Sequence, residues 1–122
     1  MALIVTTGYT KNHRATVRKI SRRSRYRFVA RFQRDDGHGE DGPEEETSVE
    51  VCLPAMTSLQ MNVALNYWWE DEFLPVNPDV SNLVDCDATI VKVNVSEPSR
   101  SELSRRIGLF VKEKFSLRED WI

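Results

Sequence analysis

The feature that most constrains the fold is a two-residue alternation of apolar and polar side chains, which occurs twice between residues 24 and 54. In "RYRFVARFQ" the apolar side chains alternate mainly with arginines, and in "ETSVEVCL" they alternate with glutamate, serine and cysteine. Successive side chains of a strand point to opposite faces, whereas a helix would scatter this pattern around its axis. The turn-rich "DDGHGEDGP" between the two runs therefore predicts an antiparallel hairpin, 24–54, with one apolar and one charged face.

Further strands are expected on both sides of this hairpin. The segments "ALIVTTG" (2–8) and "HRATVRKIS" (13–21) surround a turn and predict an N-terminal hairpin over 2–21. The β-branched run 83–95 predicts the last strand of the sheet. Between the strands, 55–82 is expected to be a long inter-strand loop, in which periodicity leaves "SLQMNVALNYWWEDEF" open between a helix and an extended arm.

The C-terminal region, 97–122, is predicted to be helical. Ser96 is suited to the N-cap, and Pro98 falls in the first turn, where the missing N–H of proline costs nothing. Lys112 and Lys114 fall in the last turns, which favour positive charge. Between these ends, apolar residues follow one another at the i, i+4, i+7, i+8 spacing of a stripe that must be buried. The stripe consists of Leu103, Ile107, Phe110 and Val111.

Strands followed by a helix predict the α+β class: an N-terminal β-hairpin and an antiparallel sheet, followed by a C-terminal helix or helices packed on one face. A chain of 122 residues, 40% of them hydrophobic, is expected to form one domain, 1–122. It has no apolar run long enough to cross a membrane and no secretory signal, so we expect a soluble protein. One helix is narrow cover for about five or six strands, and we expect dimerisation, with joined sheets and shared helices, to complete the fold.

Charge is unevenly distributed along the chain. Residues 1–34 contain ten Lys or Arg and no acid, whereas residues 35–50 contain eight Asp or Glu and no Lys or Arg. This segregation, hidden in a net charge of −2, is open to two interpretations. The molecule is basic on one surface and acidic on another and meets polyanions or its own copies, or the two signs pair internally across the hairpin.

Signals for catalysis or metal binding are weak. Cys52 and Cys86 lack metal-ligand spacing, and we expect buried strand residues rather than a disulfide within or between subunits. His13 and His38 lie in turn-like segments without a ligand pattern and are expected at the surface. The carboxylates of 40–46 lack the spacing of a calcium loop. We therefore expect no enzyme, no metal and no cofactor.

Two stretches carry a resemblance to a known family. The run "RYRFVARFQRDD", continued by "EEETSVEVCLP", is similar to a central hairpin that ends in a proline before a long loop. The segment "DATIVKVNVSEPSRSEL" is similar to a junction between a last strand and a first helix. Both are typical of the coat proteins of single-stranded RNA bacteriophages, the leviviruses, which the layout of this chain resembles over roughly half its length.

The resemblance implies a homodimer whose continuous sheet lines the inside of an icosahedral capsid, with helices that clasp the partner subunit on the outside. Genomic single-stranded RNA, including a translational-operator hairpin, would bind the inner sheet face in the virion, and neither a membrane nor a small-molecule substrate is implied. Glu46 and Glu50 would hold neighbouring arginines extended. The RNA-binding residues expected on this basis are Arg25, Arg27, Arg31, Gln33, Lys92 and Asn94.

Interfaces between subunits are expected at two further places. The apolar stripe Leu103, Ile107, Phe110 and Val111 is the expected dimer interface. The loop 55–82 would make contacts between subunits through the adjacent Tyr67, Trp68 and Trp69, of which one or two are expected in the core and the rest at a subunit contact or stacked on a base. Trp121 is also expected at an interface.

Two other functions remain open from the sequence. A non-assembling, dimeric nucleic-acid-binding regulator would use the same basic strands and the acidic loop as a protein-docking site. A small α+β enzyme or ligand binder would place its pocket between sheet and helix. The size of the expressed protein separates the first of these from a coat protein.

Overall fold

The described part of the chain, residues 23–95 and 101–121 of a computed structural model, contains a three-stranded antiparallel sheet with the order β2-β1-β3. The strands are β1 (Arg23–Asp35), β2 (Asp41–Pro54) and β3 (Val80–Val95). The predicted hairpin 24–54 is confirmed, and the strand predicted over 83–95 begins earlier, at Val80. The predicted hairpin over 2–21 lies outside the described residues. With its two helices, the structure confirms the α+β class.

The connection between β2 and β3 is helical for most of its length, which decides the alternative of helix or extended arm that the sequence leaves open within 55–82. Helix α1 (Ser58–Asn66) continues into a π-helical segment, η2 (Tyr67–Phe73), and a 3₁₀ turn, η3 (Leu74–Val76). Thr57 caps α1 reciprocally, because its Oγ1 accepts the N–H of Gln60 and its own N–H donates to the Gln60 side chain. The residues that this helix buries lie at helical spacing: Met61, Ala64, Leu65, Trp68 and Trp69.

The C-terminal helix, α2 (Glu102–Lys114), begins later than the sequence predicts. Its N-cap is Ser101, whose Oγ accepts the N–H of Ser104 at 3.1 Å, and the expected cap and proline, Ser96 and Pro98, lie outside the described residues. The buried Ser104 hydroxyl accepts the backbone N–H of Cys52 at 3.0 Å and ties α2 to β2. After α2 the described chain ends with a short 3₁₀ turn, η4 (Glu119–Trp121).

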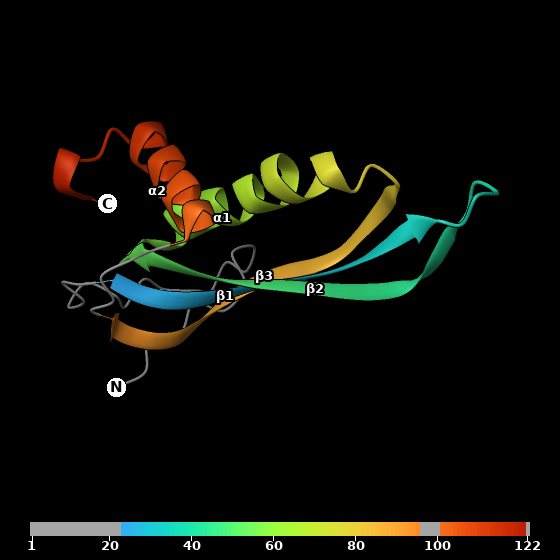
Figure 1. Ribbon diagram of the computed structural model, residues 1–122, viewed down its shortest axis with the longest axis horizontal. Helices are drawn as coiled ribbons and strands as arrows, with labels where there is room; N and C mark the ends of the chain where they lie inside the picture. Colours follow the sequence, from blue (N-terminus) through green and yellow to red (C-terminus); the bar gives the residue numbers. More distant parts are fainter. Residues whose placement is uncertain (1–22, 96–100, 122) are drawn as a thin grey trace.

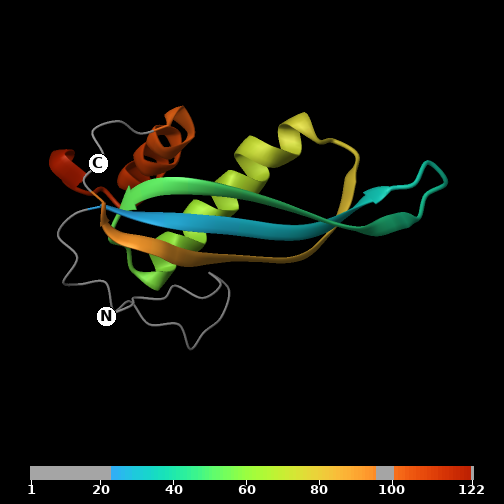
Figure 2. The ribbon, with the colours of Figure 1, turned by 60° about the horizontal axis from the view of Figure 1, so that its bottom comes forward.

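All of the described helices lie on one face of the sheet (Figures 1 and 2). The core forms between this face and the helices, where Phe28 contacts Trp68 at a centroid distance of 5.8 Å and Phe32 contacts Trp69 at 5.7 Å. Phe73 stacks on Trp69 at 5.0 Å and closes the cluster. Burial of these aromatic side chains on one side only leaves the other side of the sheet, which we call the open face, without cover from any described element.

Two polar clamps hold the helical layer in place. Arg106 of α2 donates two hydrogen bonds to Glu72 of η2, at 2.8 and 3.1 Å, and this contact lowers the pKa of Glu72. Beside it, the rings of Tyr67 and Phe110 stack at 4.6 Å. These contacts fix α2 against the helix that covers the sheet.

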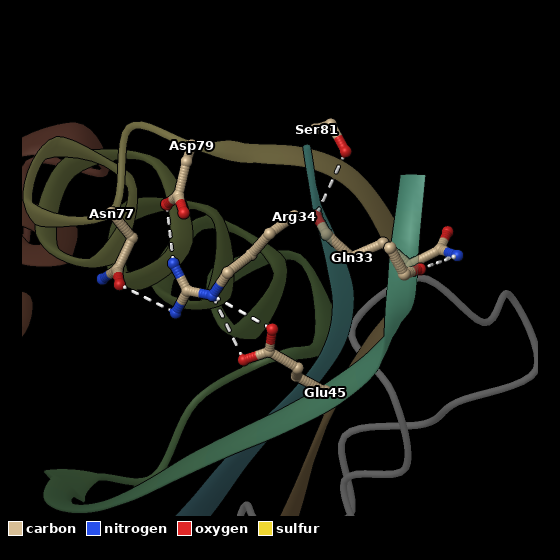
Figure 3. A network of polar contacts seen from close by, with 7 residues as sticks. Gln33, Arg34, Glu45, Asn77, Asp79 and Ser81 are labelled. Carbon is tan, nitrogen blue, oxygen red and sulfur yellow. Dashed lines mark hydrogen bonds and ion pairs between the residues drawn. The ribbon is translucent and has the colours of Figure 1, made fainter. Parts of the chain in front are cut away.

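The second clamp surrounds Arg34 near the end of β1 (Figure 3). Its guanidinium donates to both carboxylate oxygens of Glu45 on β2 at 3.1 Å. It also donates to Asp79 at 2.6 Å and to Asn77 at 3.1 Å, in the turn that leads into β3. Because the same group lies 5.2 Å from the centre of the Phe32 ring, one side chain joins β1, β2, the turn and the aromatic core.

Candidate nucleic-acid interface

The open face is built by every second residue of β1 and by its cross-strand neighbours. Tyr26, Phe28 and Ala30 point into the core with no exposed surface, so the residues between them point the opposite way. In the antiparallel register, residues directly opposite each other share a face. Between Arg25 and Gln33 of β1, this rule places on the open face Arg25, Arg27 and Arg31 of β1, Glu44, Glu46 and Glu50 of β2, and Asp85, Asp87 and Lys92 of β3.

One end of the open face is cationic. Arg25 lies opposite Lys92 of β3, and Arg27 follows on the same strand. We call these three residues the cationic patch. Among the described residues, the carboxylate of Glu50 contacts this patch: it accepts from Arg27 Nη2 at 2.7 Å and lies 3.9 Å from Arg25 Nε. Within the patch so defined, three positive charges face this one negative charge.

The other end of the open face, toward the hairpin tip, is anionic. Arg31 donates to both carboxylate oxygens of Asp85 on β3 and, at 3.4 Å, to Glu44 on β2. Glu46 is its direct cross-strand neighbour, and Asp87 lies one position further along the face. We call Glu44, Glu46, Asp85 and Asp87 the acidic patch; with Arg31 its formal charge is −3.

Mutual repulsion in the acidic patch contributes to a raised pKa of Asp87. Desolvation raises the pKa of this carboxyl group, and the neighbouring charges of Asp85 and Glu46 raise it further, while Arg31 opposes them. The hydrogen bond with Asp85 raises the pKa of Arg31. The guanidinium of Arg31 therefore compensates part of the negative charge of several carboxylates, and it bonds with Glu44 on β2 and Asp85 on β3.

Irregularities in β3 explain how Asp85, Asp87 and Lys92 come to share a face. The register between β1 and β3 shifts twice along this stretch, so that Val84 and Val91 are extra residues without a direct partner on β1. A regular strand would place odd and even positions on opposite faces, whereas the bulge at Val91 brings Lys92 to the face of Asp85 and Asp87. Simple alternation therefore missed both aspartates.

The residues that the sequence predicts to bind RNA lie in different parts of the open face. Arg25, Arg27 and Lys92 lie together in the cationic patch, whereas Arg31 lies in the acidic patch. The expected pairing of Glu50 with an arginine is confirmed, while Arg31 bonds with Glu44 and Asp85, and not with Glu46. Two expected residues lie at the ends of the face: Gln33 donates to the Gly42 carbonyl at 2.9 Å, and Asn94 is exposed at a φ of 54°.

The residues expected at subunit contacts lie mainly in the core of their own chain. Ile107 and Val111 have no exposed surface, and Trp68 and Trp69 are 4% exposed, so none of the four is available to a partner in the folded chain. The stripe of α2 is thus buried by its own sheet and by α1, and its burial does not require a second subunit. Its other members, Leu103 and Phe110, are half-buried beside that core, as are Tyr67 and Trp121.

Both cysteines are buried thiols, as predicted, Cys52 in β2 and Cys86 in β3. Burial, with smaller contributions from the neighbouring Asp87 and Asp85, raises the pKa of the Cys86 thiol to about 12. We expect Cys86 of the native protein to resist alkylation by iodoacetamide at pH 8 and to react fully in urea. Quantification of the modified peptide by mass spectrometry checks this result, and rapid native labelling of Cys86 would contradict the observed burial.

Other kinds of site find little support in the described residues. Within 23–95 and 101–121, no group of three or more His, Cys, Asp or Glu side chains is arranged to hold a metal ion, and no helix is long and apolar enough to cross a membrane. His38 lies exposed in the loop between β1 and β2, whereas His13 lies outside the described residues. A surface hollow of about 540 Å³ lies at the hairpin tip, lined by Asp35, Glu40 and Asp79 among others, and not between sheet and helix.

Comparison with known proteins gives no match: no protein-family model, curated protein or solved structure matches this chain. The resemblance to phage coat proteins is therefore carried by two sequence stretches, in 25–54 and 87–103. The described sheet itself is covered by helices on one face and carries the cationic patch on the other.

Proposed function

We propose that this chain is the structural coat subunit of a single-stranded RNA phage, which dimerises, assembles into an icosahedral shell and holds RNA against the open face of its sheet. The observation that carries the proposal is the one-sided sheet, whose described helices all lie on one face (Figure 1). Such a subunit has an outer layer of helices and an inner layer of ordered polar side chains. The resemblance of two sequence stretches to coat proteins supports the same function.

RNA would bind at the cationic patch rather than along the whole open face. Arg25, Arg27 and Lys92 offer three cations within two adjacent strands, and the side chain of Arg27 is 48% exposed. Phosphate contacts release counterions and give affinity without sequence specificity. The acidic patch repels the backbone of RNA, so contact would end before Arg31.

Dimerisation would use the edge of β3 that no other strand of the described sheet pairs with. This strand spans Val80–Val95 and has β1 as its partner within the described sheet. Its bulge residues Val84 and Val91 are 36% and 42% exposed. A long edge strand with apolar side chains favours pairing with another strand. By contrast, the edge of β2 carries Pro43 and several glutamates, which discourage such pairing.

Expression of the full chain and determination of particle size test the assembly. Particles of virion dimensions that contain host RNA support the proposal, whereas a dimer that is stable under all conditions would instead support a nucleic-acid-binding regulator. Because both functions predict RNA binding, size is the measurement that separates them.

Two matched arginine variants test the position of the RNA. Arg27→Gln in the cationic patch is expected to reduce the RNA affinity and to lower the slope of log affinity against log salt by about 0.7, the value for one lost phosphate contact on a single strand. Arg31→Gln, on the same strand and face, is expected to change neither quantity appreciably, because Arg31 already bonds with Asp85 and Glu44. Filter binding at several salt concentrations measures both. Equal losses in the two variants would contradict a site confined to the cationic patch.

A further inference from the structure

The cationic patch contains its own anion. Glu50 faces two of the three cations and divides its oxygens between them: Oε2 accepts from Arg27 at 2.7 Å, and Oε1 lies 3.9 Å from Arg25 Nε. The Glu50 side chain is 43% exposed and the Arg27 side chain 48%, so both groups are open to solvent and to a ligand. Glu50 therefore occupies the position from which a phosphate group would reach the same donors.

An exposed ion pair of this kind is easily exchanged. Surface pairs contribute little to stability, since both side chains lose mobility and both are well solvated when apart. A phosphodiester offers two anionic oxygens to the same planar guanidinium donors. Carboxylate and phosphate thus compete for Arg25 and Arg27 on nearly equal terms, and the bound carboxylate lowers the affinity that these arginines would otherwise have.

We infer that Glu50 is an intramolecular competitor that sets the affinity of the cationic patch for the phosphodiester backbone of single-stranded nucleic acid. The inference rests on the proposed function. It assigns to Glu50 the role of weakening RNA binding. A coat subunit that binds RNA weakly can dissociate and bind again while the shell assembles. The acidic patch has a different role: its carboxylates surround Arg31, and they do not bond with Arg25 or Arg27.

The test is a comparison of Glu50→Gln with Glu46→Gln in the full chain. Both substitutions remove one negative charge from the open face of β2, four residues apart, and both keep the size of the side chain. Binding is measured by fluorescence anisotropy with a labelled oligouridylate of about 12 nucleotides, at several salt concentrations. Circular dichroism checks that each variant folds, and Glu50→Thr, a polar and β-branched substitution, provides a second variant without the carboxylate.

The expected result is that Glu50→Gln and Glu50→Thr bind the oligonucleotide about five- to tenfold more tightly than the unaltered chain, with a steeper salt dependence. Glu46→Gln is expected to change the affinity by less than about twofold, because Arg31 keeps its contacts with Asp85 and Glu44. The gain should disappear at high salt, where phosphate contacts are screened.

Other outcomes separate the two proposals. If the unaltered chain binds and Arg27→Gln weakens binding, but Glu50→Gln leaves the affinity unchanged, the role of Glu50 is overturned and the proposed function stands. An equal gain in Glu50→Gln and Glu46→Gln also overturns that role, because the effect is then one of overall charge. If neither the unaltered chain nor Glu50→Gln binds the oligonucleotide, the proposed RNA site is overturned and the inference falls with it.

Discussion

Replacement of Phe28 by Ala is expected to lower the free energy of unfolding by about 3–5 kcal/mol, which is the range for truncation of a buried aromatic side chain. Phe28 has no exposed surface and lies on the central strand, where its ring contacts Trp68 at 5.8 Å. Removal of the ring leaves a cavity between β1 and the helix above it, and the rigid neighbours on both sides cannot close it. Because a domain of this size is stable by only about 5–15 kcal/mol, the loss is a large fraction of the total.

Urea denaturation followed by tryptophan fluorescence measures this loss, because Trp68 and Trp69 lie in the core beside Phe28 and Phe32. The matched control is Leu59→Ala in α1, which removes an apolar side chain that is 61% exposed and should cost less than about 0.5 kcal/mol. Equal losses in the two variants would show that the aromatic residues do not form the core described above.

The double substitution Val84→Lys and Val91→Lys is expected to abolish assembly and to leave a folded monomer. If two copies pair through the edge of β3, these changes place four lysines in one interface, where like charges at close range cost several kcal/mol. We expect the dissociation constant of the dimer to rise by at least about a hundredfold. The fold should persist, because the two residues are 36% and 42% exposed and neither belongs to the buried core.

Sedimentation velocity over a range of protein concentrations measures the change in size. Leu59→Lys, which charges an exposed apolar residue on the helical layer, is the control and should leave assembly intact. If the β3 variant still dimerises with unaltered affinity, the interface lies elsewhere, for example at the half-buried Tyr67 and Phe110. That result would contradict dimerisation through the edge of β3, but it would leave the proposal that RNA binds the open face unaffected.

Much of the sheet could be predicted because its strands keep a two-residue period over a long stretch. Between Arg25 and Gln33 the period alone separates the core from the open face, and the structure follows it residue by residue. The last strand was predictable in position from its β-branched residues, but not in the face of each side chain. Bulges at Val84 and Val91 change the parity within the strand, and they depend on tertiary pairing with β1, which no local pattern reports.

Periodicity left the segment that forms the helix over 58–76 open between a helix and an extended arm, although a signal for the helix is present. Met61, Ala64, Leu65 and Trp68 recur at the spacing of a helix face, and Thr57 with Gln60 forms a capping box. Further apolar residues, such as Leu59, lie off that face and hide the period. The helix is specified by its cap and by the aromatic surface below it, more than by its own amphipathicity.

The charge pattern of the sequence left two arrangements open, internal pairing across the hairpin and separation of positive from negative charge, and the structure contains both. Internal pairing across the hairpin occurs at Arg27 with Glu50 and at Arg34 with Glu45. A separation of sign also occurs, but along the strands rather than between two surfaces, because β3 contributes Asp85 and Asp87 at one end and Lys92 at the other. Sequence order alone does not show which charges of three strands lie together.

The position of β1 in the middle of the sheet has a consequence for synthesis of the protein. Its contact with β2 forms within a hairpin, but its other neighbour, β3, follows much later in the chain, and the bond from Arg31 to Asp85 joins residues 54 positions apart. A ribosome that adds about 5–20 residues per second needs a few seconds to pass from the end of β2 to the end of β3. During that interval β1 lacks its second partner in the described sheet, and its row of aromatic side chains lacks the described helical layer. This is the period in which the protein is most prone to aggregate, and binding of a chaperone to the nascent chain would have its greatest effect there.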